Sequence, residues 1–135
     1  MIIDEQGNEI KSTKTVPLGI VSEEEQCLIR AYLQGAVYAW CNCKKQDEFR
    51  FATFSGGDNY YWEGTYLYPL YENQPTNDNE KAIADAAKYG GTLLMQVLEN
   101  DKRVFASKKV KANGGAWRVN VYSWTGKRGK GMIGH

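Results

Sequence analysis

The segment that begins at Ser22 places the strongest constraint on the fold. Glu25 follows Ser22 by three residues, which is the spacing of a capping box. The Ser22 hydroxyl can accept from the amide of Glu25, and the Glu25 carboxylate can accept from the amide of Ser22. Glu23, Glu24 and Glu25 also place negative charge in the first turn, where the helix dipole favours it. The pattern predicts a helix from residue 22 to about residue 43.

We expect this helix to be central and largely buried. Its apolar residues cover much of the circumference and are Leu28, Ile29, Tyr32, Leu33, Ala36, Val37 and Trp40. Gly35 and Ala36 are small, so we expect them to let a neighbouring element approach closely. Lys44 and Lys45 follow at the end where positive charge is favoured.

A second long helix is predicted after the turn-forming residues 75–79. Asn77 and Glu80 have the spacing of a helix cap. The apolar residues that then recur at helical spacing are Ile83, Ala84, Ala87, Leu94, Val97 and Leu98. Gly90 and Gly91 interrupt the pattern and indicate a kink or a close crossing with the first helix.

Short β-prone runs occupy much of the remaining chain. Residues 2–11 predict a small hairpin that pairs with a later strand. Residues 48–54 alternate and predict a strand with Phe49 and Phe51 on its inner face. Residues 60–71 are compatible with a short helix or a strand. A longer hairpin is predicted with arms 103–111 and 116–124 around an Asn-Gly-Gly turn at 113–115.

These elements and the composition predict one α+β domain. The chain has 135 residues, of which 42% are hydrophobic and 24% charged, as in ordinary globular proteins. Residues 1–124 are expected to form the domain, with two long helices packed on short strands and a C-terminal basic β-hairpin. Residues 125–135 are expected to form a basic, mobile tail.

The cysteines and the N-terminus favour a soluble, cytoplasmic protein. Cys27, Cys41 and Cys43 are an odd number, and the last two point in different directions on a helix, so we expect free thiols. No stretch has the composition of a secretory signal or the roughly 18 apolar residues of a membrane helix.

Metal binding and nucleophilic catalysis lack the residues they need. Cys41 and Cys43 are too close in sequence for a zinc motif, and the single histidine, His135, lies in the tail. We therefore expect no metal and no cofactor. A serine or cysteine nucleophile would have no histidine base within the domain. Asp58 and Glu63 could act as an acid–base pair, although Asp58 also suits a turn. The sequence therefore favours a protein that is not an enzyme.

The charge distribution gives the first indication of a partner. Residues 1–100 hold 8 basic and 15 acidic residues, a net charge of −7, whereas residues 101–135 hold 9 basic residues and one acidic residue, a net charge of +8. Such asymmetry suggests a polyanionic or acidic partner. It is equally compatible with neutralisation of the acidic part by the basic part within the molecule.

The basic hairpin is the leading candidate site for contacts with nucleic-acid phosphates. The candidate residues are Lys108, Lys109, Lys111, Arg118, Lys127, Arg128 and Lys130. Lysines that protect an exposed edge strand from aggregation would give the same pattern.

A dense aromatic run, residues 60–71, supports two rival hypotheses. Tyr60, Tyr61, Trp62 and Tyr66 could form a protein-interaction or homodimer surface. With Asp58 and Glu63 they could instead bind a sugar or another small molecule. The alternative to both is that half of the run belongs to the core and half to its rim.

Long helices followed by a terminal basic hairpin resemble the layout of winged-helix domains, which would imply DNA binding. No specific residue supports that resemblance, and fold alone does not confer function. The second long helix also carries few cations, Lys81 and Lys88, against several acidic residues. This departure argues against base reading in the major groove by that helix.

Overall fold

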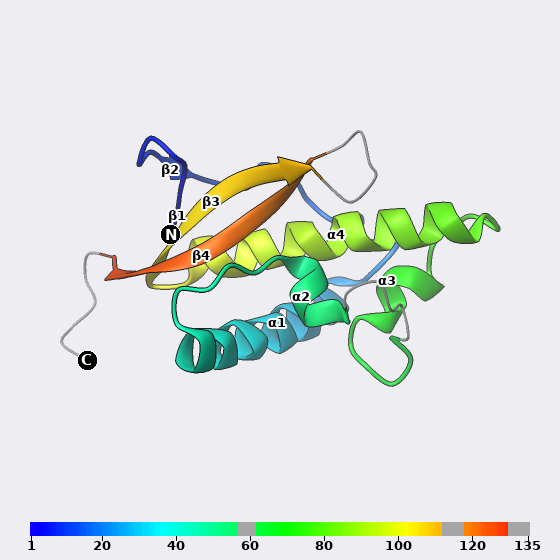
Figure 1. Cartoon of the computed structure of the whole chain (residues 1–135). Helices are drawn as coiled ribbons and strands as arrows, with labels where there is room; N and C mark the ends of the chain where they lie inside the picture. The colour runs from blue at the N-terminus through cyan, green and yellow to red at the C-terminus, as the bar shows by residue number, and fades with distance from the viewer. Residues whose placement is uncertain (57–61, 112–117, 130–135) are drawn as a thin grey trace.

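Two long helices lie on one side of a four-stranded sheet in the computed structural model, which describes residues 1–56, 62–111 and 118–129 (Figure 1). The helices are α1 (Glu23–Lys44), α2 (Phe51–Ser55), α3 (Tyr68–Glu72) and α4 (Asn79–Asn100). The strands are β1 (Ile2–Ile3), β2 (Glu9–Ile10), β3 (Arg103–Lys111) and β4 (Arg118–Arg128). The predicted α+β class, with two long helices and a C-terminal hairpin, is confirmed.

Helix α1 begins with the predicted capping box. The Ser22 hydroxyl accepts from the amide of Glu25 at 3.1 Å, and the Glu25 carboxylate accepts from the amide of Ser22 at 2.9 Å. The expectation that α1 is largely buried is wrong. Only one stripe is buried, formed by Gln26, Ile29, Leu33, Val37 and Cys41. Leu28 and Tyr32 are exposed. Among the described residues, no atom of another element lies within 4 Å of a Cβ built on Gly35, so none of them approaches there.

Helix α4 begins one residue later than the predicted cap. Asp78 is the N-cap, and its carboxylate accepts from the amides of Glu80 and Lys81. A carboxylate at this position satisfies two otherwise unpaired amides. In the first half of α4 the buried residues are Ala82, Ala86 and Gly90 rather than the expected Ile83, Ala84 and Ala87.

Gly90 allows a close approach by α2, not by the first long helix. A Cβ built on Gly90 would overlap the Phe51 ring, whereas one built on Gly91 would meet no atom within 4 Å. Helix α4 continues through both glycines without interruption. The interpretation of Gly90 as a close-contact position is correct, but the predicted partner is wrong.

The sheet has the order β2-β1-β3-β4. Strands β1 and β2 pair antiparallel, as the sequence predicts, and β1 pairs parallel with β3, which joins the N-terminal hairpin to a later strand. The Met1 amino group donates to the carbonyls of Leu98, Asp101 and Arg103, and so satisfies backbone groups at the end of α4 and the start of β3.

The strand predicted over residues 48–54 is not formed. Only Phe49 pairs with β4, through reciprocal backbone hydrogen bonds with Tyr122. The chain then turns into α2 because the Thr53 hydroxyl accepts from the amide of Arg50. Phe49 and Phe51 are nevertheless both buried, as expected. Their alternation therefore reports burial rather than a strand.

Within residues 60–71 the helical alternative is confirmed for the part that is described. Helix α3 covers Tyr68–Glu72, with Pro69 in its first turn. Backbone amides in the first turn have no acceptor within the helix, so a proline there costs no hydrogen bond. Thr65 does not cap α3, which begins after Leu67. Residues 57–61 lie outside the described part of the chain.

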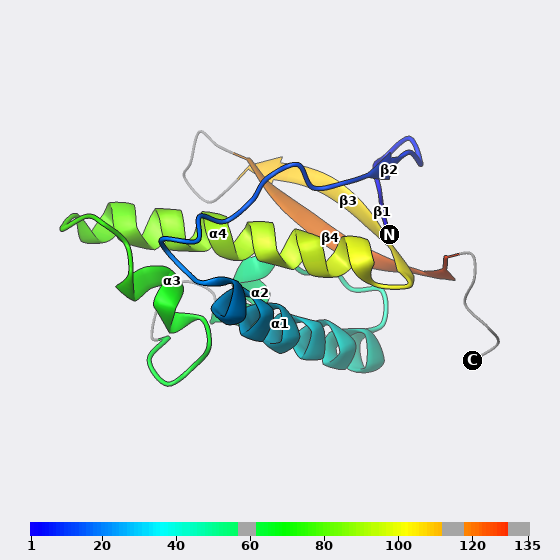
Figure 2. The ribbon, with the colours of Figure 1, turned by 180° about the vertical axis from the view of Figure 1, so that it is seen from behind.

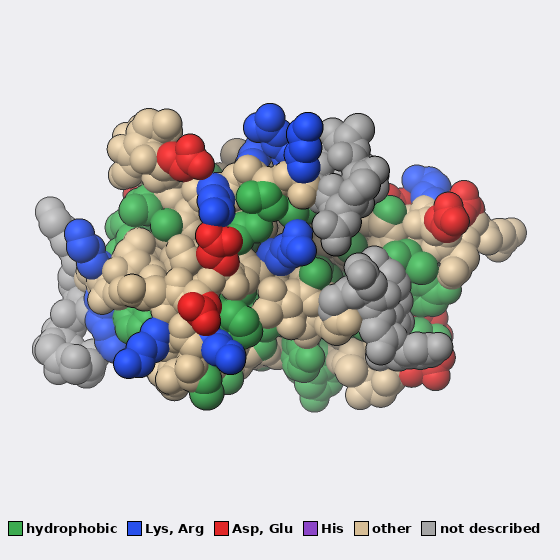
Figure 3. Space-filling model, viewed as in Figure 1, with side chains coloured by type: hydrophobic (Ala, Val, Ile, Leu, Met, Phe, Trp, Pro, Cys, Tyr) green, Lys and Arg blue, Asp and Glu red, His purple; other side chains and the backbone are tan. Residues whose placement is uncertain are grey.

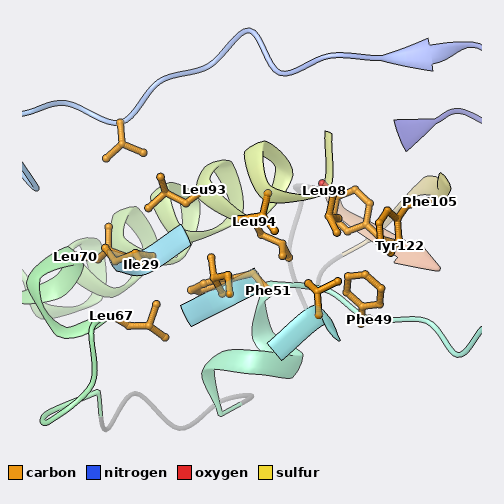
Figure 4. Packing of buried hydrophobic residues seen from close by; sticks show 14 of the residues in the cluster. Ile29, Phe49, Phe51, Leu67, Leu70, Leu93, Leu94, Leu98, Phe105 and Tyr122 are labelled. Atoms are coloured by element: carbon orange, nitrogen blue, oxygen red, sulfur yellow. The ribbon is translucent and has the colours of Figure 1, made fainter. Parts of the chain in front are cut away.

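One core joins the sheet to all four helices. Figure 4 shows Ile29 of α1, Leu94 of α4 and Phe105 of β3 converging on the same interior. At the sheet end of this core, the Phe49 ring packs edge-on against Phe105 and at a tilt against Tyr122, at centroid distances of 5.9 and 6.0 Å. These contacts hold the base of the C-terminal hairpin against the helices. In the part of the chain that the structure describes, no helix is long and apolar enough to cross a membrane.

Candidate functional site

The predicted C-terminal hairpin is present, and its second strand is longer than expected. Strand β4 continues to Arg128, beyond the predicted end at Trp124. The Thr125 hydroxyl donates to the carbonyl of Val104 at 2.8 Å, and the Gly129 amide donates to the carbonyl of Lys102 at 2.7 Å. The expected turn at 113–115 and the candidate Lys130 lie outside the described residues.

The register of the hairpin assigns its cations to faces. Lys111 pairs with Arg118 and Lys109 pairs with Asn120, whereas Lys108 pairs with Val121. Directly paired residues share a face, and every second residue along a strand returns to that face. Lys109, Lys111 and Arg118 therefore share one face.

That face is the one that carries Phe105 nearer the base of the hairpin. Phe105 is fully buried, whereas Lys109, Lys111 and Arg118 are all exposed. The apolar core thus stops before this end of the hairpin, and three cations continue the same face into solvent. We call Lys109, Lys111 and Arg118 the distal basic cluster.

Lys108 points to the other face and has an acidic partner. Its ammonium lies 2.6 Å from a carboxylate oxygen of Glu48. The hydrogen bond from Lys108 to Glu48, together with the charge of that carboxylate, raises the pKa of Lys108. Glu48 reaches Lys108 because Phe49 is paired with Tyr122 at the edge of β4. Of the candidate residues that the structure describes, Lys108 is therefore the one with a carboxylate partner in the molecule.

No such partner is found for the distal basic cluster. Among the residues that the structure describes, no carboxylate lies within ion-pair distance of Lys109, Lys111 or Arg118. Like charges placed directly opposite each other on two strands are destabilising. The pairing of Lys111 with Arg118 is thus unfavourable for the fold itself.

A second group of cations lies where β4 ends. Lys127 and Arg128 are exposed there. The Gln46 amide donates to the carbonyl of Thr125 at 3.2 Å, which brings the C-terminal end of α1, with Lys44 and Lys45, to the same place. Figure 3 shows Lys and Arg side chains over the sheet and around the end at which β4 stops. We call Lys44, Lys45, Lys102, Lys127 and Arg128 the proximal basic cluster.

Arg103 belongs to neither cluster, because it is a core residue. Its guanidinium is buried, lies 3.0 Å from the Asp101 carboxylate and stacks over the Tyr38 ring at 4.1 Å from the centroid. The Trp124 ring lies on another side of it at 5.6 Å. In the sequence, only the position of Asp101 two residues before Arg103 indicates that this arginine has an acidic partner.

Two residues of the predicted aromatic surface, Trp62 and Tyr66, lie in the described part of the chain, and they differ in burial. Trp62 is buried, donates through its indole to the carbonyl of Ser55 and packs edge-on against Phe51. Tyr66 is exposed. Tyr60 and Tyr61 lie outside the described residues, as does Asp58. The expectation that Trp62 belongs to an interaction surface is wrong, because its ring completes the core.

An open cleft of about 470 Å³ lies elsewhere, between the loop after β2, the loop after α3 and the first turns of α4. Sequence reasoning missed it, because it depends on how two loops meet. Lys81 and Asp85 line it and pair with each other at 3.1 Å. Tyr89 and Pro17 add apolar surface. Its two charged groups satisfy each other, so the cleft offers no unpaired charge to a ligand.

The described residues contain no group of three or more His, Cys, Asp or Glu side chains that could hold a metal ion. Cys27, Cys41 and Cys43 are free thiols, and burial raises the pKa of Cys41. Comparison with known proteins adds nothing to these observations: no family model, no curated sequence and no solved structure matches the chain.

Proposed function

We propose that this chain binds nucleic acid through phosphate contacts made by the two ends of its β3–β4 hairpin. The observation that carries this proposal is the distal basic cluster. There Lys111 is paired with Arg118 across the strands, and no described carboxylate compensates either charge. A polyanion would supply that compensation, and phosphates form strong charge-assisted hydrogen bonds with Lys and Arg.

The spacing of the two clusters supports a backbone ligand. Arg118 and Lys127 are nine residues apart on β4, which corresponds to at most about 30 Å at about 3.3 Å per residue, because the strand is irregular between Trp124 and Arg128. That distance is close to one turn of duplex DNA, about 34 Å. It also suits an extended single strand that follows the hairpin. Contacts of this kind recognise phosphates, so we propose little sequence specificity.

The proposal revises the set of contact residues. Lys108 contributes less than its neighbours because Glu48 already neutralises it. Arg103, buried against Asp101, contributes nothing directly. Trp124 does not stack on a base, since its indole donates to the carbonyl of Lys127 and lies beside Arg103. The phosphate contacts are assigned to the distal and proximal basic clusters.

The winged-helix resemblance is limited to the order of the last two elements, a long helix followed by a hairpin. Helix α4 buries one side along its length and pairs Lys81 with Asp85 on its surface. Neither feature equips it to read base edges in a major groove. We therefore assign DNA or RNA contact to the hairpin and none to α4.

The test is a titration of fluorescent oligonucleotides, both a random duplex and a single strand, followed by anisotropy at several salt concentrations. The logarithm of the binding constant should fall linearly with the logarithm of the salt concentration, because binding releases cations from the nucleic acid. Replacing Lys109, Lys111 and Arg118 together by Gln should lower the slope by up to about three units. Circular dichroism should stay native, because these side chains are exposed.

Lys108→Gln is the matched control. It removes a lysine from the same strand, one residue from Lys109, but on the other face and already paired. It should change the slope by clearly less than Lys109→Gln does. Absence of binding at low salt, or equal effects of the two single variants, would overturn the proposal.

A further inference from the structure

Along the middle of α1, one face of the helix is exposed and carries no charge. Between Arg30 and Lys44 the helix contains no charged residue. Three of the five exposed large hydrophobic side chains of the described chain lie on this face: Leu28, Tyr32 and Tyr38, at 41%, 37% and 55% exposure. The outer face of a surface helix normally carries charged and polar residues. We call this surface the outer face of α1.

The outer face of α1 is centred on Gly35, and the same residue types lie at equal distances before and after it. At 3.6 residues per turn, Ala31 and Ala39 lie at equal heights and angles on either side of Gly35, and so do Tyr32 and Tyr38. A helix laid antiparallel on this face therefore meets the pattern that it presents itself. No atom of the described chain outside α1 lies within 4 Å of a Cβ built on Gly35, which leaves the centre open for a second backbone.

An antiparallel pair also matches large residues with small ones. Tyr32 lies about 4.5 Å along the axis from Gly35, and Ala39 lies about 6 Å away on the other side, at a rise of about 1.5 Å per residue. With a two-fold axis beside Gly35, Tyr32 of one copy comes level with Ala39 of the other, on the same side of the contact. Tyr38 likewise comes level with Ala31 of the second copy.

The charges at the two ends of α1 select the same orientation. Glu23 and Glu24 are exposed at its beginning, and Lys44 and Lys45 are exposed at its end. Glu23 is held by Arg30 of the same helix, at 3.2 Å, but the described residues offer Glu24 no cation. Antiparallel packing places Glu24 level with Lys45 of the second copy, twice by symmetry, whereas parallel packing would bring like charges together.

We propose that the outer face of α1 binds a second copy of this chain, as an antiparallel helix pair around a two-fold axis at Gly35. Charge complementarity between the two ends argues for a second copy over an unrelated partner. Figures 1 and 2 show α1 on the side of the molecule opposite the hairpin. The pair takes only Lys45 from each proximal basic cluster and leaves both distal basic clusters accessible, and its existence does not depend on nucleic-acid binding.

A single helix pair of about 33 Å is smaller than a standard interface, so we expect a dimer with a Kd in the micromolar range or above. Sedimentation velocity from about 1 µM to about 1 mM should show the weight-average mass rising from monomer to dimer. Gly35→Glu should raise the Kd about tenfold or more, because it places two carboxylates against each other at the axis. The monomer tolerates the change, since Gly35 is open and helical.

Gly91→Glu is the matched control, because Gly91 is also an open glycine within a long helix and lies on α4. It should leave the Kd unchanged. Glu24→Lys and Lys45→Glu should each weaken the dimer, and the double variant should regain most of the loss, because the charge pair is restored in reverse. A monomer at the highest concentration, an unaltered Kd in Gly35→Glu, or no recovery in the double variant would overturn the proposal.

Discussion

Replacing each of the adjacent glycines of α4 by alanine should change stability in opposite directions. Alanine is more favourable than glycine in a helix interior by about 1 kcal/mol. At Gly91 no atom lies within 4 Å of the new Cβ, so that gain is retained and Gly91→Ala should raise the free energy of unfolding by about 0.5–1 kcal/mol. The protein therefore contains its own reference for the helix-propensity effect.

At Gly90 the same gain meets a steric conflict with Phe51. The new Cβ would overlap several ring carbons of Phe51, and that ring packs edge-on against Trp62 at 5.9 Å and is buried. Overpacking of this kind costs about 1–3 kcal/mol. We expect Gly90→Ala to lower the free energy of unfolding by about 1–2 kcal/mol after the propensity gain is included.

Urea unfolding followed by far-ultraviolet circular dichroism would measure both variants. Phe51→Leu removes the ring, so in that background Gly90→Ala should become neutral or stabilising, and the double-mutant cycle should show coupling above about 1 kcal/mol. Equal stability changes in Gly90→Ala and Gly91→Ala, or an absence of coupling with Phe51, would refute the packing of α2 against α4.

Two further predictions follow from single side chains. Burial raises the pKa of Tyr122 to about 12, above the ordinary value near 10 that it regains on unfolding. The buried, protonated Tyr122 hydroxyl therefore adds to the free energy of unfolding. This contribution, about 3 kcal/mol, is fully present below pH 10 and is lost as the pH rises through 12. Urea unfolding at increasing pH would measure this fall in the free energy of unfolding. Tyr122→Phe should show a smaller fall between pH 10 and 12, and the same fall in the variant and the original protein would contradict the prediction. Ser22→Ala should cost about 1 kcal/mol because the Glu25 amide loses its acceptor, and an unchanged urea midpoint would show that this cap contributes nothing.

The parts of the fold that sequence predicts correctly are those specified by neighbouring residues. The capping box at Ser22 involves groups three residues apart, so it forms wherever the chain folds around it. The C-terminal hairpin likewise pairs consecutive strands. The buried stripe of α1 is different, because it depends on where α4 lies, and Leu28 and Ile29 cannot be distinguished by their own chemistry.

The error at residues 48–54 has the same origin. Phe49 and Phe51 both enter the core, one from an isolated bridge and the other from a helix. Alternation of apolar residues reports which side chains are buried and not which backbone conformation buries them. Within this segment the amide of Arg50 donates to the Thr53 hydroxyl, a contact three residues apart that forms at the start of α2 and has no place in a strand.

The sequence predicts which cations belong to the candidate site, but not which of them lack an acidic partner. Strand alternation alone separates Lys108 from Lys109, but only the tertiary position of Glu48 shows that Lys108 is neutralised. The role of Arg103 similarly depends on Tyr38, which is 65 residues away in sequence. Charge counts therefore overestimated the number of cations free to meet a ligand.

The most direct test of the proposed function is to map the surface that a nucleic acid contacts. Amide chemical shifts of the ¹⁵N-labelled protein would be followed while a short oligonucleotide is added at low salt. The account predicts shifts at Lys109, Lys111 and Arg118 and at the end of β4, which disappear when salt is raised because the contacts are ionic. Shifts confined to α1 or to the surroundings of Tyr66, or no shifts at all, would contradict it.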